Sequence, residues 1–224
     1  MVEGIGRAVA TGLDRARQGR LCFYGPPGTG KTAYARWIAT SLGVPIVVRR
    51  GSDILSKWVG EAEQNIAAAF RLATDSGAVL LIDEVDSFLQ DRRGATRSWE
   101  VTLVNEMLTQ MECFSGVFIA STNLVADLDQ AALRRFDLKL RFDFMRPDQC
   151  WKLLQRHCEA LGIAAPQPSL RMSLNPLANL ALGDFAAVAR QHRFRPFESP
   201  AAFVAALAQE CALKDSFRPA IGFA

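Results

Sequence analysis

Two short runs of the sequence carry residues that could do chemistry on a phosphate group. The first, GPPGTGKT, follows an apolar stretch and precedes a helical pattern. Its glycines let backbone N–H groups turn inward around phosphate oxygens, and the helix N-terminus adds partial positive charge. We expect Lys31 to reach the β- and γ-phosphates of a nucleotide and Thr32 to ligate Mg²⁺. The alternative is a plain glycine turn, which the full pattern disfavours. The predicted nucleotide-binding residues of this run are Gly25, Pro26, Pro27, Gly28, Thr29, Gly30, Lys31 and Thr32.

The second run, VLLIDE, ends in two adjacent carboxylates, Asp83 and Glu84. Carboxylates at the end of a buried strand are costly unless they have a cation or a task. Asp83 is the natural protein ligand of Mg²⁺ and completes the predicted nucleotide site. Glu84 can orient or deprotonate an attacking water. A solvated strand end is the alternative, which the preceding phosphate loop disfavours.

The elements that must position these residues alternate between strand and helix. Apolar runs predict strands at residues 20–25, 44–50, 78–84, 116–123 and 138–144, and the runs at 44–50 and 78–84 read as buried strands. Helical spacing predicts helices at residues 31–43, 61–73 and 98–111. This alternation predicts an α/β fold with a parallel sheet flanked by helices, as in P-loop NTPases.

The alternation of strand and helix patterns ends at Pro147, and the sequence after it shows no convincing strand pattern. The pattern predicts helices at residues 148–162, 183–194 and 199–214, with Asp184 and Ser199 as N-caps of the last two. We therefore expect two domains, a nucleotide-binding α/β domain at residues 1–145 and a small all-helical lid domain at residues 146–224.

Composition limits the class of protein. Half of the 224 residues are hydrophobic, enough for a real core, and the net charge of +3 is too small to argue for nucleic acid. The five cysteines show no metal or redox spacing, which indicates reduced thiols and an intracellular protein. No apolar run reaches membrane-spanning length and no signal-peptide pattern starts the chain, so we expect a cytoplasmic protein.

Taken together, the motifs GPPGTGKT, LLIDEVDSF, ASTN and LDQAALRRFD resemble the AAA+ ATPases, in that family's order and approximate spacing. The resemblance covers essentially the whole chain and points to the classical AAA branch, in particular the katanin, spastin and ESCRT-disassembly group. It implies ATP and Mg²⁺ as cofactors and hydrolysis of ATP to ADP and phosphate. It also implies self-association into a ring, which we expect to be a hexamer.

The resemblance implies catalytic roles beyond Glu84. Asn123 matches the sensor-1 position, where a side-chain amide holds the attacking water. Arg134 and Arg135 match arginine fingers, which reach the nucleotide of the neighbouring subunit. A turn-forming asparagine and an ordinary basic turn are the respective alternatives.

Two residues of the second domain match nucleotide-contacting positions. His157 matches a lid histidine near the base and ribose, although a core or surface histidine is an equal alternative. Gly183, in LGDFAAV, stands at the sensor-2 position. No arginine is found there, as in other classical members, but Asp184 replaces the usual alanine that follows the glycine. Residues 4–6, GIG, lie where the family's linker passes the adenine, and their glycines predict a turn.

The run KWVG, Lys57, Trp58, Val59 and Gly60, resembles the loop that lines the central pore of AAA rings. A large flat apolar side chain can grip extended polypeptide without selecting a sequence. The alternative is that Trp58 packs onto its own domain. The run DRRGATR, with Arg92, Arg93 and Arg97, is either a second pore loop or a solvated loop.

These features predict an ATP-driven AAA+ module that assembles into a ring and translocates or remodels protein. A nucleic-acid-dependent AAA+ ATPase such as a helicase loader is the alternative, and a nucleotide-binding scaffold without turnover is a third. Nucleic acid is the less favoured partner because no strongly basic surface or DNA-binding module is evident. We expect the chain to be part of a longer protein, because no substrate-recruiting region precedes it, and proteolysis is not expected because no H-E-x-x-H motif occurs.

Overall fold

The computed structural model describes residues 2–56, 58, 60–87, 98–124, 128 and 130–216. The chain divides into two compact units. Residues 1–25 and 31–142 form the first, and residues 26–30 and 143–224 form the second. The predicted domain boundary after residue 145 stays a prediction.

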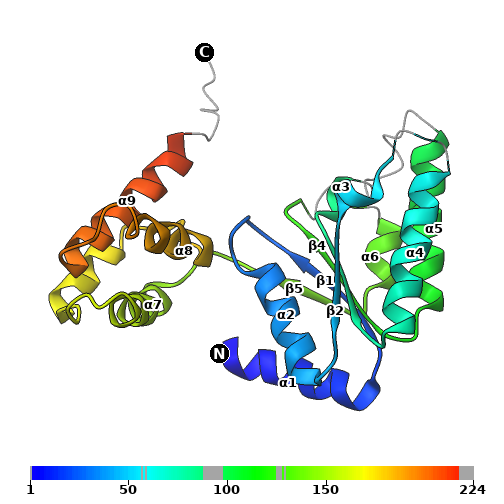
Figure 1. The fold of residues 1–224 in the computed structure, drawn as a ribbon, viewed down its shortest axis with the longest axis horizontal. Coiled ribbons are helices and arrows are strands. Elements are labelled where there is room, and N and C mark those ends of the chain that lie inside the picture. Colours follow the sequence, from blue (N-terminus) through cyan, green and yellow to red (C-terminus); the bar gives the residue numbers. More distant parts are fainter. Residues whose placement is uncertain are drawn as a thin grey trace. The chain divides into compact units, whose positions relative to one another are not determined.

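A five-stranded parallel sheet forms the centre of the first unit (Figure 1). Its strands are ordered β2-β3-β4-β1-β5, which confirms the predicted parallel α/β fold. β4 lies between β3 and β1, although it follows both in the sequence. The strands are β1 (Gly19–Tyr24), β2 (Ile46–Arg50), β3 (Val79–Asp83), β4 (Val117–Thr122) and β5 (Leu138–Arg141).

Helices cover both faces of this sheet (Figure 1). One face carries α1 (Val2–Ala16) and α2 (Lys31–Leu42), and the other carries α4 (Glu61–Asp75), α5 (Ser98–Cys113) and α6 (Gln130–Arg135). The short helices α3 (Gly51–Ile54) and η1 (Val85–Ser87) follow β2 and β3. Alternate residues of β3 serve the two faces: Leu80 and Ile82 pack in the core with α4 and α5, and Leu81 packs with α2.

The first helix departs from the prediction. The glycines of residues 4–6 favour a turn, but these residues lie inside α1. The backbone carbonyl of Gly6 accepts a hydrogen bond of 3.3 Å from the Tyr34 hydroxyl of α2. A methyl group at Gly6 would lie 3.4 Å from the Tyr34 ring. The glycine therefore suits a close approach of two helices.

The second unit is helical. It contains α7 (Pro147–Ala160), η4 (Pro168–Leu174), α8 (Leu182–Gln191) and α9 (Pro200–Ser216), and residues 143–216 contain no strand. Its core includes Leu154, Phe185, Val188, Phe203 and Leu207, all fully buried. The predicted helical character of this part of the chain is confirmed.

The two predicted N-caps of this unit differ in outcome. The Ser199 hydroxyl accepts a hydrogen bond of 3.3 Å from the Ala202 N–H, as an N-cap does. Asp184 is not the N-cap of α8, because the helix starts two residues earlier and Ala181 occupies the cap position. The Asp184 carboxylate instead reaches back to the Ala181 N–H at 2.7 Å.

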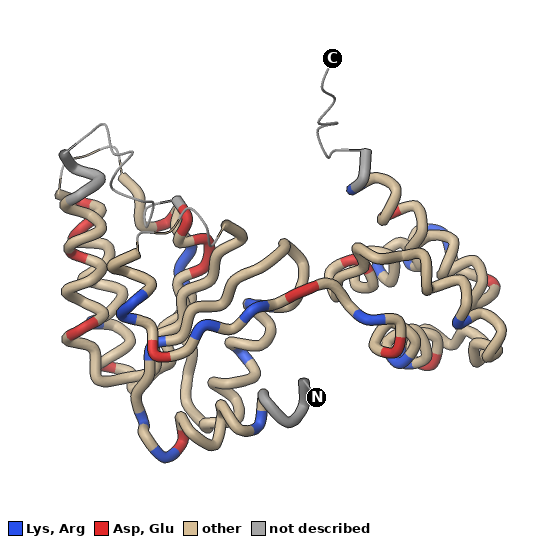
Figure 2. Tube along the Cα trace, turned by 180° about the vertical axis from the view of Figure 1, so that it is seen from behind, with Lys and Arg blue, Asp and Glu red and all other residues tan. Residues whose placement is uncertain are grey.

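Charged residues of both signs are interspersed along both units (Figure 2). None of the described helices is both long and apolar enough to cross a membrane. The run with Arg92, Arg93 and Arg97 lies outside the described residues, as do Lys57 and Val59.

Candidate active site

The carboxyl edge of the sheet collects the polar residues that the sequence singles out. Strands β3, β4 and β1 are neighbours and run parallel, so their last residues meet at one edge. Asp83 ends β3, Asn123 follows β4 and Gly25 follows β1. Ligands of open parallel sheets bind outside the carboxyl ends of the strands, so this edge is the candidate active site.

Gly25 starts the phosphate loop under a strict steric requirement. Its φ of +131° lies in the left-handed region, and a methyl group on its Cα would lie 1.9 Å from the Phe142 carbonyl oxygen. The Phe142 N–H in turn donates a hydrogen bond of 2.7 Å to the Tyr24 carbonyl. No residue with a side chain fits at Gly25, because the backbone after β5 lies directly against it.

Lys31 connects the start of the loop with the end of β4. Its ammonium Nζ donates hydrogen bonds of 2.7 Å to the Gly25 carbonyl and 2.7 Å to the Asn123 Oδ1. The residue is only 7% exposed, and burial lowers the pKa of its ammonium from the usual 10.5. The nearby carboxylates of Asp83, Asp86 and Glu84 act in the opposite direction but do not outweigh the burial. A phosphate beside Nζ would add negative charge that favours the ammonium form.

Asp83 is held through both carboxylate oxygens. The Thr32 hydroxyl donates a hydrogen bond of 2.6 Å to Oδ2, and the Ser121 hydroxyl donates one to Oδ1. The predicted neighbours Thr32 and Asp83 are therefore in contact. Ser121 is not among the residues that the sequence motifs predict, although its place two residues before Asn123 in β4 puts it at the same edge.

The donor set fits Mg²⁺ bound together with a phosphate. Mg²⁺ takes oxygen ligands and commonly binds through one or two carboxylates, substrate phosphates and waters. Thr32 and Asp83 supply one hydroxyl and one carboxylate side by side. Among the residues that the structure describes, no cluster of three histidine, cysteine or acidic side chains could hold a metal ion. Thr32 and Asp83 would supply protein ligands to such a site, and phosphate and water would complete it.

Glu84 has an unusual backbone. Its φ of +60° is left-handed, a conformation that costs a residue with a side chain about 1–2 kcal/mol. It directly follows Asp83, and its side chain is exposed. Backbone strain of this kind occurs at sites where a side chain must take a set direction. The role of Glu84 toward an attacking water stays a prediction.

Thr122 shapes the turn that presents Asn123. Its side chain is fully buried, and its hydroxyl accepts a hydrogen bond of 2.9 Å from the Leu124 N–H. Such a side-chain contact two residues along stabilises a turn directly after a strand. Asn123 is thereby held where its amide oxygen accepts the bond from Lys31.

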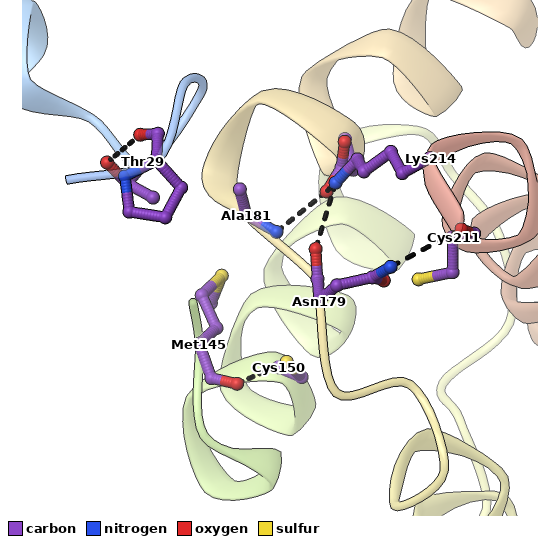
Figure 3. Close-up of polar contacts among 9 residues, drawn as sticks. Thr29, Met145, Cys150, Asn179, Ala181, Cys211 and Lys214 are labelled. Atoms are coloured by element: carbon purple, nitrogen blue, oxygen red, sulfur yellow. Dashed lines mark hydrogen bonds and ion pairs between the residues drawn. The ribbon is translucent and has the colours of Figure 1, made fainter. Parts of the chain in front are cut away.

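Residues 26–30 of the phosphate loop pack with the helical unit. The Gly183 N–H donates a hydrogen bond of 2.8 Å to the Gly28 carbonyl, and a methyl group at Gly183 would lie 3.1 Å from the Gly28 Cα. Within the loop, the Thr29 hydroxyl donates a hydrogen bond of 2.7 Å to the Pro26 carbonyl (Figure 3). The predicted sensor-2 residue therefore contacts the phosphate loop, and only glycine allows that approach without displacement.

An ion pair anchors the start of α8, in the network around Asn179, Cys211 and Lys214 (Figure 3). The Lys214 ammonium of α9 forms an ion pair with the Asp184 carboxylate and donates a hydrogen bond of 2.9 Å to the Asn179 carbonyl. The Asn179 side-chain amide donates a hydrogen bond of 3.3 Å to the Cys211 carbonyl. Asp184 is only 8% exposed, so its partners are needed to offset the cost of burying its charge. The loop before α8 is thus tied to the end of α9.

His157 lies against the aromatic core of the helical unit. Its ring stacks on Phe185 and Phe203, with centroid distances of 5.9 Å to each. Burial lowers the pKa of its imidazole from 6.5, which favours the neutral ring. These contacts favour a packing role, and the predicted contact with the nucleotide stays a prediction.

The two adjacent arginines of LRRFD differ in their surroundings. The Arg135 guanidinium forms an ion pair with Glu112 of α5 through Nε and donates a hydrogen bond of 3.1 Å to the Ala131 carbonyl. Arg134 has an exposed side chain at the end of α6. Arg135 is therefore held within its own chain, while Arg134 is presented to solvent.

Trp58 is exposed to 78%, the second-highest exposure among the large hydrophobic side chains that the structure describes. It does not pack onto its own domain, which was the alternative to a pore-loop role. The Ser56 hydroxyl accepts a hydrogen bond of 3.2 Å from the Trp58 N–H and itself donates one to the Glu61 carboxylate. The Glu61 N–H donates a hydrogen bond of 3.3 Å to the Trp58 carbonyl. The loop that carries the indole is therefore fixed at its base.

A parallel sheet with this glycine loop after β1, its lysine, and an aspartate at the end of β3, one strand beyond β4, defines a P-loop nucleotide-binding protein. A family model described as "ATPase family associated with various cellular activities (AAA)" matches residues 21–144. The chain belongs to this AAA family of ATPases.

Curated relatives agree with this assignment. The chain is 31% identical to spastin of Drosophila melanogaster over 196 residues, 83% of this chain and 26% of the relative. Spastin of Drosophila willistoni gives the same identity over the same length, with 25% of the relative covered. Protein SAV of Sulfolobus acidocaldarius is 42% identical over 126 residues, 52% of this chain and 16% of the relative. The chain is thus spastin-like, and it spans about a quarter or less of these relatives.

Proposed function

We propose that this chain binds Mg²⁺ and ATP at the carboxyl edge of its sheet and hydrolyses ATP to ADP and phosphate. The observation that carries the proposal is the contact network in which Lys31 bonds to Asn123 and Thr32 bonds to Asp83. It brings together residues separated by up to 92 positions in the sequence, all with the chemistry that phosphate transfer needs.

Each side chain has a part in the proposed reaction. Lys31 and the backbone N–H groups of the loop bind the phosphates, and Thr32 and Asp83 would hold Mg²⁺. When bound, Mg²⁺ neutralises charge on the β- and γ-phosphates. Glu84 orients a water and takes its proton as the oxygen bonds to the γ-phosphorus, while the bond to the β-phosphate oxygen breaks and ADP leaves. Asn123 holds that water beside Glu84.

The arginines extend the proposal to a ring. Arg134 is exposed and can reach the nucleotide of a second copy, where a guanidinium neutralises charge in the transition state. Arg135, which matches the second finger position, is bound to Glu112 in its own chain and would have to exchange that partner to act across an interface. A closed ring, in this proposal a hexamer, presents each nucleotide to the arginines of a neighbour.

The exposed Trp58 supports a protein substrate. An indole on a loop fixed at its base offers apolar area for gripping an extended polypeptide in a central pore. The interspersed charges of both units do not favour nucleic acid as the main partner (Figure 2). The proposed whole is an ATP-driven machine that remodels or translocates protein.

The first test compares ATP binding and turnover of wild type and Glu84→Gln. The amide keeps the size of the side chain but takes up no proton, so we expect wild-type ATP affinity and a loss of turnover of at least about 100-fold. Lys31→Met, which loses the phosphate contact, should lose binding as well. Full turnover by Glu84→Gln would sink the catalytic assignment.

A further inference from the structure

Ser121 occupies a buried position beside the carboxylate that is assigned to Mg²⁺. It is the fifth residue of β4 and only 1% exposed. Ile82 of β3 pairs with Ala120 of β4 in the parallel ladder, so Asp83 and Ser121 are the next residues along the two strands. The Ser121 hydroxyl donates its hydrogen bond to the Asp83 Oδ1. The contact is thus built by strand register.

The two oxygens of Asp83 have separate hydroxyl donors. Thr32 bonds to Oδ2 at 2.6 Å and Ser121 to Oδ1. The terminal torsion of an aspartate is broad, so a single hydrogen bond leaves the carboxylate plane free to turn. A second donor on the opposite oxygen fixes that plane. The Ser121 hydroxyl therefore determines which way Oδ2 faces, although Thr32 is the donor that touches it.

We propose that Ser121 is a positioning residue that sets the divalent-cation affinity of the nucleotide site through Asp83. This proposal rests on the proposed function, because it concerns the cation bound with the nucleotide. Ser121 contacts the carboxylate on the oxygen opposite to Thr32, so its effect on a cation passes through Asp83. Partners of this kind orient ligands, and their loss typically weakens metal binding by about 10–100-fold.

The test separates the cation from the nucleotide. A fluorescent ADP analogue is bound to wild type and Ser121→Ala, first with a chelator and then with increasing Mg²⁺, and Mn²⁺ binding is followed independently by its electron paramagnetic resonance signal. We expect Ser121→Ala to keep the chelator-state nucleotide affinity within about two-fold and to need about ten-fold more cation for half-saturation.

Further variants separate positioning from mere packing. Ser121→Thr keeps the hydroxyl and should restore the wild-type cation requirement even where its extra methyl group lowers the melting temperature. Ser121→Cys fills the same space with a weak hydrogen-bond donor and should need as much cation as Ser121→Ala does. The cysteine variant also replaces the alanine variant in this test if the latter fails to fold. Thr40→Val removes the hydroxyl that bonds to the Arg36 carbonyl on α2, away from Asp83, and should leave the cation requirement unchanged.

Each outcome has one meaning. A cation requirement that is the same in wild type, Ser121→Ala and Ser121→Cys, with nucleotide affinity retained, overturns the positioning role. A lower melting temperature with no change in cation requirement has the same consequence, because it marks a packing role alone. Wild-type protein that binds no adenine nucleotide would overturn the proposed function itself, and this proposal with it.

Discussion

The Lys31 ammonium donates a 2.7 Å hydrogen bond to the Asn123 side-chain oxygen, which joins the start of α2 to the end of β4. The bond links the residue predicted to bind phosphate with the residue predicted to hold the attacking water. Since Lys31 also bonds to the Gly25 carbonyl, its ammonium has protein acceptors where a phosphate would be expected. We expect nucleotide binding to exchange one of these partners at Nζ for a phosphate oxygen.

This exchange predicts proton uptake on nucleotide binding at alkaline pH. Burial lowers the pKa of Lys31 from 10.5, so below that pH a fraction of the folded protein carries a neutral amine. Bound phosphates add negative charge, raise the pKa again and draw in a proton. Calorimetric titration with ADP, in two buffers of different ionisation heat, should give an uptake that is absent near neutral pH and appears as pH rises through the lowered pKa of Lys31.

The comparison variant is Asn123→Ala, which keeps Lys31 and removes one acceptor of its ammonium. It should still take up a proton with any nucleotide that it binds, while its turnover falls. Binding that takes up no proton at any alkaline pH in wild type would show that Lys31 is fully charged before the nucleotide arrives.

Gly183→Ala should weaken nucleotide binding although the residue is remote from the catalytic carboxylates in sequence. The new methyl group would lie 3.1 Å from the Gly28 Cα and 3.3 Å from its carbonyl oxygen, so the backbone of the phosphate loop must shift. Overpacking of this kind costs about 1–3 kcal/mol, and we expect an ADP dissociation constant raised by about ten-fold.

A second glycine provides the control for this substitution. Gly12 lies within α1, and no atom lies within 4 Å of the place that an added methyl group would take. Gly12→Ala should therefore leave ADP affinity unchanged and raise helix stability by about 0.5–1 kcal/mol. Equal ADP affinities for Gly183→Ala and Gly12→Ala would mean that the loop tolerates the shift.

Arg134 should act in the active site of a neighbouring copy. Arg134→Ala leaves nucleotide binding intact and lowers turnover by about 10³-fold, as for other arginine fingers. Mixing it with Glu84→Gln provides a sharp test, because an interface between one copy of each kind can combine an intact Glu84 with an intact Arg134. With equal amounts and random assembly about a quarter of the interfaces are complete, so turnover should recover to about a quarter of wild type.

Arg135→Ala is the comparison for this experiment. It removes the exposed pair with Glu112, which is worth at most about 1 kcal/mol, so the variant should fold normally. Its turnover then reports whether Arg135 leaves Glu112 to act across the interface. A mixture of Arg134→Ala and Glu84→Gln that is no more active than its separate components would remove the trans role of Arg134.

The central strands β3 and β4 were predictable because buried parallel strands are continuous apolar runs, as VLLI and VFIA are. Lys31, Thr32 and Asp83 were predictable because their roles follow from residue type and local spacing. The contact of Ser121 with Asp83 was not, since it arises from the register between two strands. The partner of Arg135 was not predictable either, since Glu112 lies on a different helix and nothing local marks the pair.

The N-terminal helix escapes prediction for a different reason. Three glycines in its first twelve residues, at positions 4, 6 and 12, lower helix propensity, so the sequence favours a turn there. Tertiary contacts outweigh that propensity: Leu13 packs with Leu21 and Phe23 of β1. Propensity is local, whereas the burial that decides the outcome is not.

His157 should make stability depend on pH near neutrality. Its folded-state pKa is lowered from 6.5 by burial, so between the two values the unfolded chain binds more protons. Stability is therefore lost as pH falls from above 6.5 toward the folded pKa. In urea unfolding, His157→Phe, which keeps an aromatic ring against Phe185 and Phe203, should lose less stability than wild type over this range.

The only other histidine of the chain is the control for that measurement. His192→Gln retains His157 and should keep the wild-type decrease of stability on acidification. If His157→Phe and wild type lose stability in parallel, the imidazole does not carry the effect. Unchanged ADP affinity in His157→Phe would assign the imidazole ring to the core alone. A clear loss of ADP affinity would place the ring beside the adenine base of the nucleotide, as the family resemblance implies.

Trp58 should couple ATP turnover to a polypeptide. Its indole is 78% exposed and its loop is fixed by Ser56 and Glu61, so an extended chain can bind without first displacing a packed side chain. At protein concentrations that favour assembly, an unfolded polypeptide should raise wild-type turnover, and Trp58→Ala should lose that increase while keeping its basal rate. Phe194→Ala is the matched control, because this aromatic is 90% exposed on the helical unit and should respond as wild type does. Stimulation by single-stranded DNA alone, lost in Trp58→Ala, would instead indicate base stacking on the indole and favour the nucleic-acid-dependent alternative.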